Sequence, residues 1–242
     1  MKLEMPEFQK AKLLVVGDIM LDRYWHGSAS RVSPEAPVPV VCVDSREGRP
    51  GGAGNVALNI SALGSAARLI GVVGKDETGE ELHSILQAAG VYCDFLWSEN
   101  KPTITKLRVT SQHQHLIRLD FEQPFENKDL MGLFDKFKEL VKDTQTIVFS
   151  DYDKGALREI SKLIDLGRSH KKPIIIDPKG TDFRKYKGAT IVTPNLSEFE
   201  SVVGRSKNEQ ELVDKGLRLV RELSLEALLI TRGEHGLTLI RP

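Results

Sequence analysis

Short apolar runs alternate with longer amphipathic stretches along most of the chain. The apolar runs are rich in β-branched residues and are bounded by glycine or polar residues, as in buried strands. They lie at residues 12–17, 68–73, 146–150, 173–177, 189–193, 227–231 and 236–240. Helical patterns fall at residues 55–63, 77–89, 130–141, 157–169, 196–203 and 209–223. Strands that alternate with helices over short links predict an α/β fold with a mostly parallel sheet and helices on both faces.

Two regions break this alternation. Residues 38–43 are apolar but contain Pro39, which favours an edge strand or a subdomain. Residues 103–110 and 116–121 alternate with the period of a strand and are joined by a polar turn, as in an antiparallel hairpin. We therefore predict a small β lid in which strands at about 38–43 and 103–121 pair with each other.

Composition narrows the possible functions. The 242 residues carry 34 Lys+Arg and 34 Asp+Glu, a balance that gives no electrostatic reason to propose a nucleic acid or membrane partner. No apolar run approaches the ~18 residues of a membrane span, and residues 1–12 lack the apolar core of a signal peptide. Cys42 and Cys93 are far apart and predict free thiols in a reducing, cytoplasmic location.

Open α/β sheets bind their ligands at the carboxyl ends of the strands, and several polar clusters fall there. Asp18 and Asp22 follow the first strand, where a pair of carboxylates can accept hydroxyl hydrogen bonds from a sugar. The alternative is a turn in which an aspartate caps a helix. The glycine run at 51–54, followed by Asn55, allows the backbone to approach a ligand, although such turns are more often structural.

Two lysines precede glycines in loops after consecutive strands. Lys154 lies in Asp-Tyr-Asp-Lys-Gly and Lys179 in Asp-Pro-Lys-Gly. A lysine in such a loop can hold a phosphate as a point charge, whereas one loop alone would more often carry a surface lysine. Because the two loops follow neighbouring strands, we expect an anionic ligand there.

Two further clusters follow later strands. Asn195 and Glu198 are three residues apart, which fits a helix capping box and fits equally a carboxylate that holds Mg²⁺ through water. The segment from Thr231 to Gly236 offers glycines and backbone amides to a nucleotide phosphate, or else forms a hairpin loop.

Taken in order, these motifs resemble the ribokinase-like (PfkB-type) carbohydrate kinases over essentially the whole chain. The motifs are Gly17-Asp18 with Asp22, the glycine-rich block at 51–64, Thr193-Pro-Asn195-x-x-Glu198 and Thr231-Arg-Gly233-x-x-Gly236. The segments at 17–24, 31–40, 117–121, 150–155 and 177–180 are similar to the heptose-phosphate kinases within that family. The resemblance implies a ribokinase-like fold and ATP-dependent phosphorylation of the C1 hydroxyl of D-glycero-β-D-manno-heptose 7-phosphate, on the route to ADP-heptose and lipopolysaccharide.

The resemblance also implies roles for individual residues. Asp18, Asp22, Gly52 and Asn55 would bind the sugar, and Lys154 and Lys179 are our additions for the sugar 7-phosphate or the ATP phosphates. Glu198 would hold Mg²⁺ through water, and the lid would pair two subunits of a homodimer. The nucleotide would be bordered by Asn195, Leu196, Ser197, Glu198, Thr231, Gly233 and Gly236.

One family signature is absent. No Gly-Ala-Gly-Asp loop, which in the family carries the catalytic base, occurs in the 242 residues. We therefore expect residues 1–242 to be the N-terminal part of one kinase domain, inactive alone, with the base beyond Pro242 and an adenylyltransferase region absent. Two other interpretations stay open: another sugar or nucleoside kinase of the family, or a non-catalytic module that binds a sugar phosphate or nucleotide.

Overall fold

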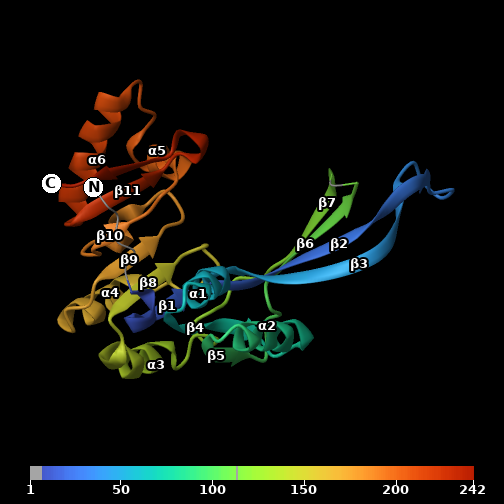
Figure 1. Cartoon of the computed structure of the whole chain (residues 1–242), viewed down its shortest axis with the longest axis horizontal. Helices are drawn as coiled ribbons and strands as arrows, with labels where there is room; N and C mark the ends of the chain where they lie inside the picture. Colours follow the sequence, from blue (N-terminus) through green and yellow to red (C-terminus); the bar gives the residue numbers. More distant parts are fainter. Residues whose placement is uncertain (1–6, 113) are drawn as a thin grey trace.

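The protein is built from an α/β body and a projecting β-sheet (Figure 1). A computed structural model describes residues 7–112 and 114–242. The body contains an eight-stranded sheet in which neighbouring strands are parallel, except that β12 runs antiparallel to β11. Its strands in spatial order are β12 (Leu237–Ile240), β11 (Ala227–Thr231), β10 (Ile191–Val192), β9 (Ile174–Asp177), β8 (Thr146–Ser150), β1 (Lys12–Gly17), β4 (Ala66–Gly74) and β5 (Tyr92–Ser98).

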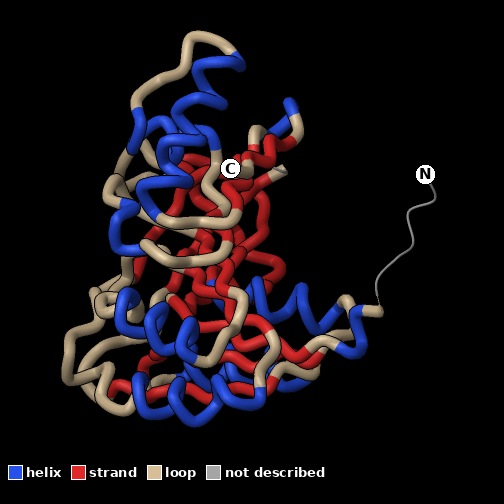
Figure 2. Tube along the Cα trace, turned by 90° about the vertical axis from the view of Figure 1, so that its left-hand side faces the viewer, coloured by secondary structure: helices blue, strands red, loops and turns tan. Residues whose placement is uncertain are grey.

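Helices cover both faces of this sheet, as the sequence predicted. Figure 2 shows helices on the outside of the body and strands in its interior. The helices are α1 (Ala53–Ala62), α2 (Glu77–Ala88), α3 (Leu133–Leu140), α4 (Ile160–Ser169), α5 (Leu196–Val203) and α6 (Glu209–Leu223). Four short 3-10 turns are η1 (Phe8–Lys10), η2 (Val141–Asp143), η3 (Phe183–Tyr186) and η4 (Gly233–His235).

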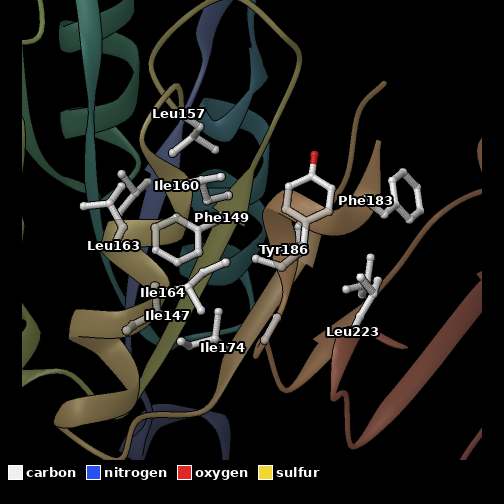
Figure 3. Close-up of a cluster of buried hydrophobic side chains, with 14 of the residues drawn as sticks. Ile147, Phe149, Leu157, Ile160, Leu163, Ile164, Ile174, Phe183, Tyr186 and Leu223 are labelled. Atoms are coloured by element: carbon white, nitrogen blue, oxygen red, sulfur yellow. The ribbon is translucent and has the colours of Figure 1, made fainter. Parts of the chain in front are cut away.

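Alternate side chains of the central strands enter two different cores. On β1, Leu14 and Val16 join the larger core, which is shared with α3, α4 and α6, and Val15 joins a smaller one formed with α1 and α2. This alternation follows from the two-residue period of a strand. Figure 3 shows part of the larger core, where Phe149 of β8 packs among aliphatic side chains of α4 and β9. Burial on both faces explains why these strands read as continuous apolar runs.

The projecting sheet, which we call the lid sheet, has four strands. They are, in spatial order, β3 (Pro39–Gly52), β2 (Ile19–Val32), β6 (Thr105–Ser111) and β7 (Gln114–Phe121). The hairpin of β6 and β7 confirms the prediction for 103–121. The predicted pairing of this hairpin with 38–43 is wrong, because β2 lies between them and β3 extends to Gly52.

The sequence did not reveal β2. Only its first residues are buried, and its remainder mixes Arg, Tyr, Trp, His and Ser without an apolar run, because both faces of this part of the sheet are partly exposed. The edge strand β5 was not predicted either, and only its residues Phe95 and Ser98 are buried. Among the residues that the structure describes, no helix combines the length and apolar composition needed to cross a bilayer.

The larger core yields a stability prediction. Phe149 is fully buried, so Phe149→Ala should lower the free energy of unfolding by about 3–5 kcal/mol, as is usual when a buried aromatic ring is removed. Phe134→Ala on α3 is the matched control, because that ring is 40% exposed. Urea denaturation followed by circular dichroism measures both, and equal losses for the two variants would contradict this account of the core.

Candidate active site

Polar residues from several parallel strands meet at one edge of the main sheet. β8, β9, β10 and β11 are neighbours, and the residues that follow their carboxyl ends surround a cavity of about 420 Å³. Its lining residues are Asp151, Tyr152, Asp177, Pro178, Lys179, Thr193, Asn195, Glu198 and Thr231. The predicted residues Lys179, Asn195, Glu198 and Thr231 are therefore brought together, and we call this cavity the strand-end cleft.

Asp18 lies beside this cleft, at the junction of the body and the lid sheet. Its carboxylate is buried and accepts three backbone N–H hydrogen bonds, from Tyr152 at 2.8 Å, Lys154 at 3.1 Å and Ala156 at 3.0 Å. Burial raises the pKa of this carboxyl, while the three N–H donors oppose that shift. The carboxylate thus fixes the loop that follows β8, a role that the sequence did not indicate.

Asp22, Gly52 and Asn55 lie on the lid side of the site. The carboxylate of Asp22 on β2 accepts a hydrogen bond from the Arg108 guanidinium at 2.6 Å. Gly52 has a φ of +56°, and a Cβ there would collide with the backbone oxygen of Asp18, so only glycine fits. Asn55 is exposed in the first turn of α1. Asp22 and Gly52 thus lie in the lid strands β2 and β3, and Asn55 lies in the helix that follows β3.

The two predicted lysines both contact carboxylates. The Lys154 ammonium lies 2.9 Å from Glu122, which follows the lid strand β7. The Lys179 ammonium lies 3.0 Å from Oε1 of Glu198, inside the strand-end cleft. Lys154 is therefore on the lid side and Lys179 on the side of the later strands.

Asn195 and Glu198 form a capping box at the start of α5. The Glu198 N–H donates to the Asn195 side chain at 2.9 Å, and the Asn195 N–H donates to Glu198 Oε2 at 3.1 Å. This is the structural alternative that the sequence left open, and it places the Glu198 carboxylate in the cleft. Leu196 is half-buried and Ser197 exposed in the same turn.

The donor set of the cleft suits Mg²⁺ bound through water and phosphate. Mg²⁺ prefers oxygen ligands and is usually held by one or two carboxylates together with waters and substrate phosphates. Asp177 and Glu198 supply such carboxylates beside the cavity. No group of three His, Cys, Asp or Glu residues within 7–112 and 114–242 could enclose a metal by itself. The cleft therefore fits a metal that arrives with a nucleotide.

The segment from Thr231 to Gly236 forms the turn of the β11–β12 hairpin. The Arg232 N–H donates to the Gly236 carbonyl at 2.8 Å, and Gly233 and Gly236 have positive φ angles of 59° and 79° with open space around them. The hairpin interpretation of this motif is thus correct. Thr231 also lines the cleft, whereas Gly233 and Gly236 are exposed beyond it.

Comparison with known proteins identifies the family. A model described as pfkB family carbohydrate kinase matches residues 10–241. The chain belongs to the pfkB family of carbohydrate kinases. It is 58% identical over 241 residues to bifunctional protein HldE of Pseudomonas entomophila and 54% identical over 242 residues to that of Yersinia enterocolitica. All of the chain aligns, but it spans about half the length of these curated relatives, 51% in both cases.

Solved structures of this family share the fold. Phosphofructokinase-2 from Escherichia coli in complex with fructose-6-phosphate superposes with a TM-score of 0.76 at 20% identity, over 96% of this chain and 77% of that one. Ribokinase from Arabidopsis thaliana complexed with ribose and ATP gives a TM-score of 0.70 at 18% identity, over 96% and 75%. The predicted ribokinase-like fold is confirmed.

Asp177 is the carboxyl of the cleft whose pKa shifts most. Burial, and secondly the nearby charge of Glu198, raise its pKa from 3.8 to about 6. The hydrogen bond from the Ser150 hydroxyl and the charge of Lys179 oppose this shift. Between pH 3.8 and about pH 6, the folded protein therefore binds more protons than the unfolded chain.

This shift predicts a pH-dependent stability. The contribution of Asp177 to the free energy of unfolding should fall as the pH rises from about 4 to about 6 and stay low above that. Asp177→Asn removes the ionised form, so it should stabilise the protein more at pH 7 than at pH 4. Urea denaturation at both pH values measures this, with the exposed Asp165→Asn on α4 as control. A pH-independent effect would be inconsistent with the raised pKa.

Proposed function

We propose that this chain binds the two substrates of a kinase reaction in which the γ-phosphoryl group of ATP is transferred to the C1 hydroxyl of D-glycero-β-D-manno-heptose 7-phosphate, within ADP-heptose and lipopolysaccharide biosynthesis. The observation that carries the proposal is the 58% identity to a bifunctional protein HldE over the entire chain. Its membership of a carbohydrate kinase family supports the same reaction class. We also propose that the whole protein is multifunctional and carries an adenylyltransferase region.

The sugar binds between the strand-end cleft and the lid sheet. Asp22 accepts hydrogen bonds from sugar hydroxyls with the oxygen atoms that Arg108 leaves available. Asp18 fixes the 152–156 loop and completes the polar wall with Gly52 and Asn55. Lys154 lies toward the lid and is placed to meet the sugar phosphate.

ATP binds at the strand-end cleft. The residues from Asn195 to Glu198 place the N-terminus of α5 at the cavity, which favours negative charge, and Lys179 adds a cation. Thr231 lies at the cavity wall, and Gly233 and Gly236 border the nucleotide outside it. Glu198 would hold Mg²⁺ through water, and the ion would neutralise charge on the phosphates.

Catalysis in this arrangement comes from positioning and electrostatics. Phosphoryl transfer requires the two reactants in line and the charge of the moving group stabilised by fixed dipoles and cations. We assign no residue of the 242 as the base that removes the hydroxyl proton, because the Gly-Ala-Gly-Asp sequence that carries it in the family does not occur among them. Ligand binding is therefore the direct test of the proposal for this chain.

Binding of the sugar phosphate should depend on Asp22. By isothermal titration, Asp22→Asn should weaken heptose 7-phosphate binding about tenfold or more, because charged hydrogen bonds are each worth ~1.5–3 kcal/mol. The affinity for a non-hydrolysable ATP analogue with Mg²⁺ should stay unchanged. Asp18→Asn should weaken the sugar too and also lower the melting temperature, since three N–H donors lose an anionic acceptor.

The exposed Asp44→Asn on β3 is the matched control for these variants. Tighter binding of ribose or adenosine than of heptose 7-phosphate by the unaltered protein would point to another kinase of the family. Equal loss of sugar and nucleotide affinity in Asp22→Asn would contradict the assignment of Asp22.

We also propose a homodimer formed through the lid sheet. On one face of β7, Ile117, Leu119 and Phe121 are 50%, 40% and 53% exposed. They are paired in register with Val109, Leu107 and Thr105 of β6, so apolar residues from two strands share this face. Ile104 and Leu107 are buried within the monomer. An apolar face of this kind favours a self-complementary interface.

The oligomeric state tests the lid interface. Light scattering at micromolar concentration should give a dimer for the unaltered chain and a monomer for Ile117→Asp, because a charge on the apolar face would be buried without a partner. Met131→Asp is the control, since Met131 is 78% exposed outside the lid sheet. A monomeric, folded unaltered protein would refute the proposed dimer.

A further inference from the structure

A buried phenol connects the two loops that carry the predicted lysines. Tyr186 lies at the end of η3 and is fully buried in the larger core, where its ring packs edge-on against Phe183 with 5.5 Å between ring centroids. Figure 3 shows its hydroxyl oxygen at the end of the ring that points away from Ile174. The ring is thus part of the core, while the hydroxyl reaches the edge of the strand-end cleft.

The Tyr186 hydroxyl acts both as donor and as acceptor. It donates to Oδ2 of Asp151, at 2.8 Å, and accepts the backbone N–H of Lys179, at 2.9 Å. Asp151 opens the loop after β8 and Lys179 lies in the loop after β9. A single oxygen atom therefore joins two loops whose own residues line the cleft.

Asp151 anchors the hydroxyl firmly. Its carboxylate is buried and accepts hydrogen bonds from the Lys185 ammonium at 2.8 Å and from the Asp153 N–H at 2.8 Å, in addition to Tyr186. A buried carboxylate with three donors is held in one orientation, because turning it would leave charged and polar groups unpaired. The position of the Tyr186 hydroxyl is consequently fixed by the packing of its ring in the core and by its hydrogen bond to Asp151.

The Lys179 loop has few other restraints. Neither Lys179 nor Gly180 makes a backbone–backbone hydrogen bond within the described ranges, and Gly180 has a φ of +91° with nothing near its Cβ position. The Lys179 side chain is 48% exposed and contacts Glu198 across the cleft. The hydroxyl of Tyr186 is therefore the contact that sets where the Lys179 backbone, and with it the ammonium group, lies.

We propose that Tyr186 is a positioning residue, which holds the Lys179 ammonium in the strand-end cleft to bind a phosphate of the nucleotide. This inference rests on the proposed function, because it takes Lys179 as a phosphate contact. In the structure, Glu198 is the partner of Lys179. A phosphate oxygen takes that place when the nucleotide binds, and the hydroxyl keeps the backbone from which the lysine side chain extends at the edge of the cleft.

A double-mutant cycle tests whether Tyr186 acts through Lys179. Affinity for a non-hydrolysable ATP analogue with Mg²⁺ is measured by isothermal titration for the unaltered protein, Tyr186→Phe, Lys179→Ala and the double variant. We expect Tyr186→Phe, which keeps the buried ring, to weaken binding about fivefold to tenfold when Lys179 is present. In the Lys179→Ala background the same change should have no further effect. Tyr92→Phe on β5, an exposed phenol, is the control.

The outcomes separate the inference from the function on which it rests. Equal weakening by Tyr186→Phe in both backgrounds would mean a purely structural role and would overturn the inference alone, as would unchanged affinity in Tyr186→Phe. If Lys179→Ala binds the analogue normally, Lys179 is not a phosphate contact and the inference alone fails. If the unaltered protein does not bind the analogue, the nucleotide assignment itself fails and the inference fails with it.

Amide hydrogen exchange provides a readout that needs no ligand. The Lys179 N–H donates to the Tyr186 hydroxyl, so Tyr186→Phe should raise the exchange rate of this amide at least tenfold, measured by NMR. Amides of β9, such as Ile176, should exchange as in the unaltered protein, which shows that the fold is retained. Unchanged exchange at Lys179 would show that the hydroxyl does not hold the loop and would overturn the inference.

Discussion

The arrangement of the site depends on the buried carboxylate of Asp18. It accepts three backbone N–H bonds from the loop after β8, while the backbone oxygen of the same residue accepts the Ala53 N–H at the start of α1. Asp18 is also the single residue between β1 and β2. The main sheet, the lid sheet, α1 and the 152–156 loop are therefore joined at one position. Burying this charge is costly, and the site keeps it only because its hydrogen bonds are made.

The second constraint is the parallel main sheet, which brings residues distant in sequence to one edge. Asp151, Asp177, Asn195 and Thr231 each lie at or beyond the carboxyl end of a different strand, and they line one cavity because the four strands are neighbours. The Tyr186 hydroxyl and the capping box of α5 then fix individual groups within the cavity. The backbone thus brings the groups together, and side-chain hydrogen bonds orient them.

Much of the body and part of the site could be predicted from the sequence. Strands β1, β8, β9 and β11 are buried on both faces and read as apolar runs. The spacing of Asn195 and Glu198 indicated a capping box as one of two interpretations. The lid strand β2 could not be predicted, since both faces of its outer part are partly exposed and its residues show no regular alternation. The roles of Asp18 and Tyr186 could not be predicted either. Their partners lie 134 and 35 residues away, and no local pattern encodes such contacts.

The position of β1 also bears on how the protein folds. This strand comes first in the chain but lies in the middle of the main sheet, where it pairs with β4 on one side and β8 on the other. During synthesis, its second edge stays unpaired until β8 has been made, more than a hundred residues later. Contacts of such long sequence separation slow folding and expose apolar strand edges in the meantime. The same order of strands that assembles the site therefore leaves one edge of an apolar strand unpaired through much of synthesis.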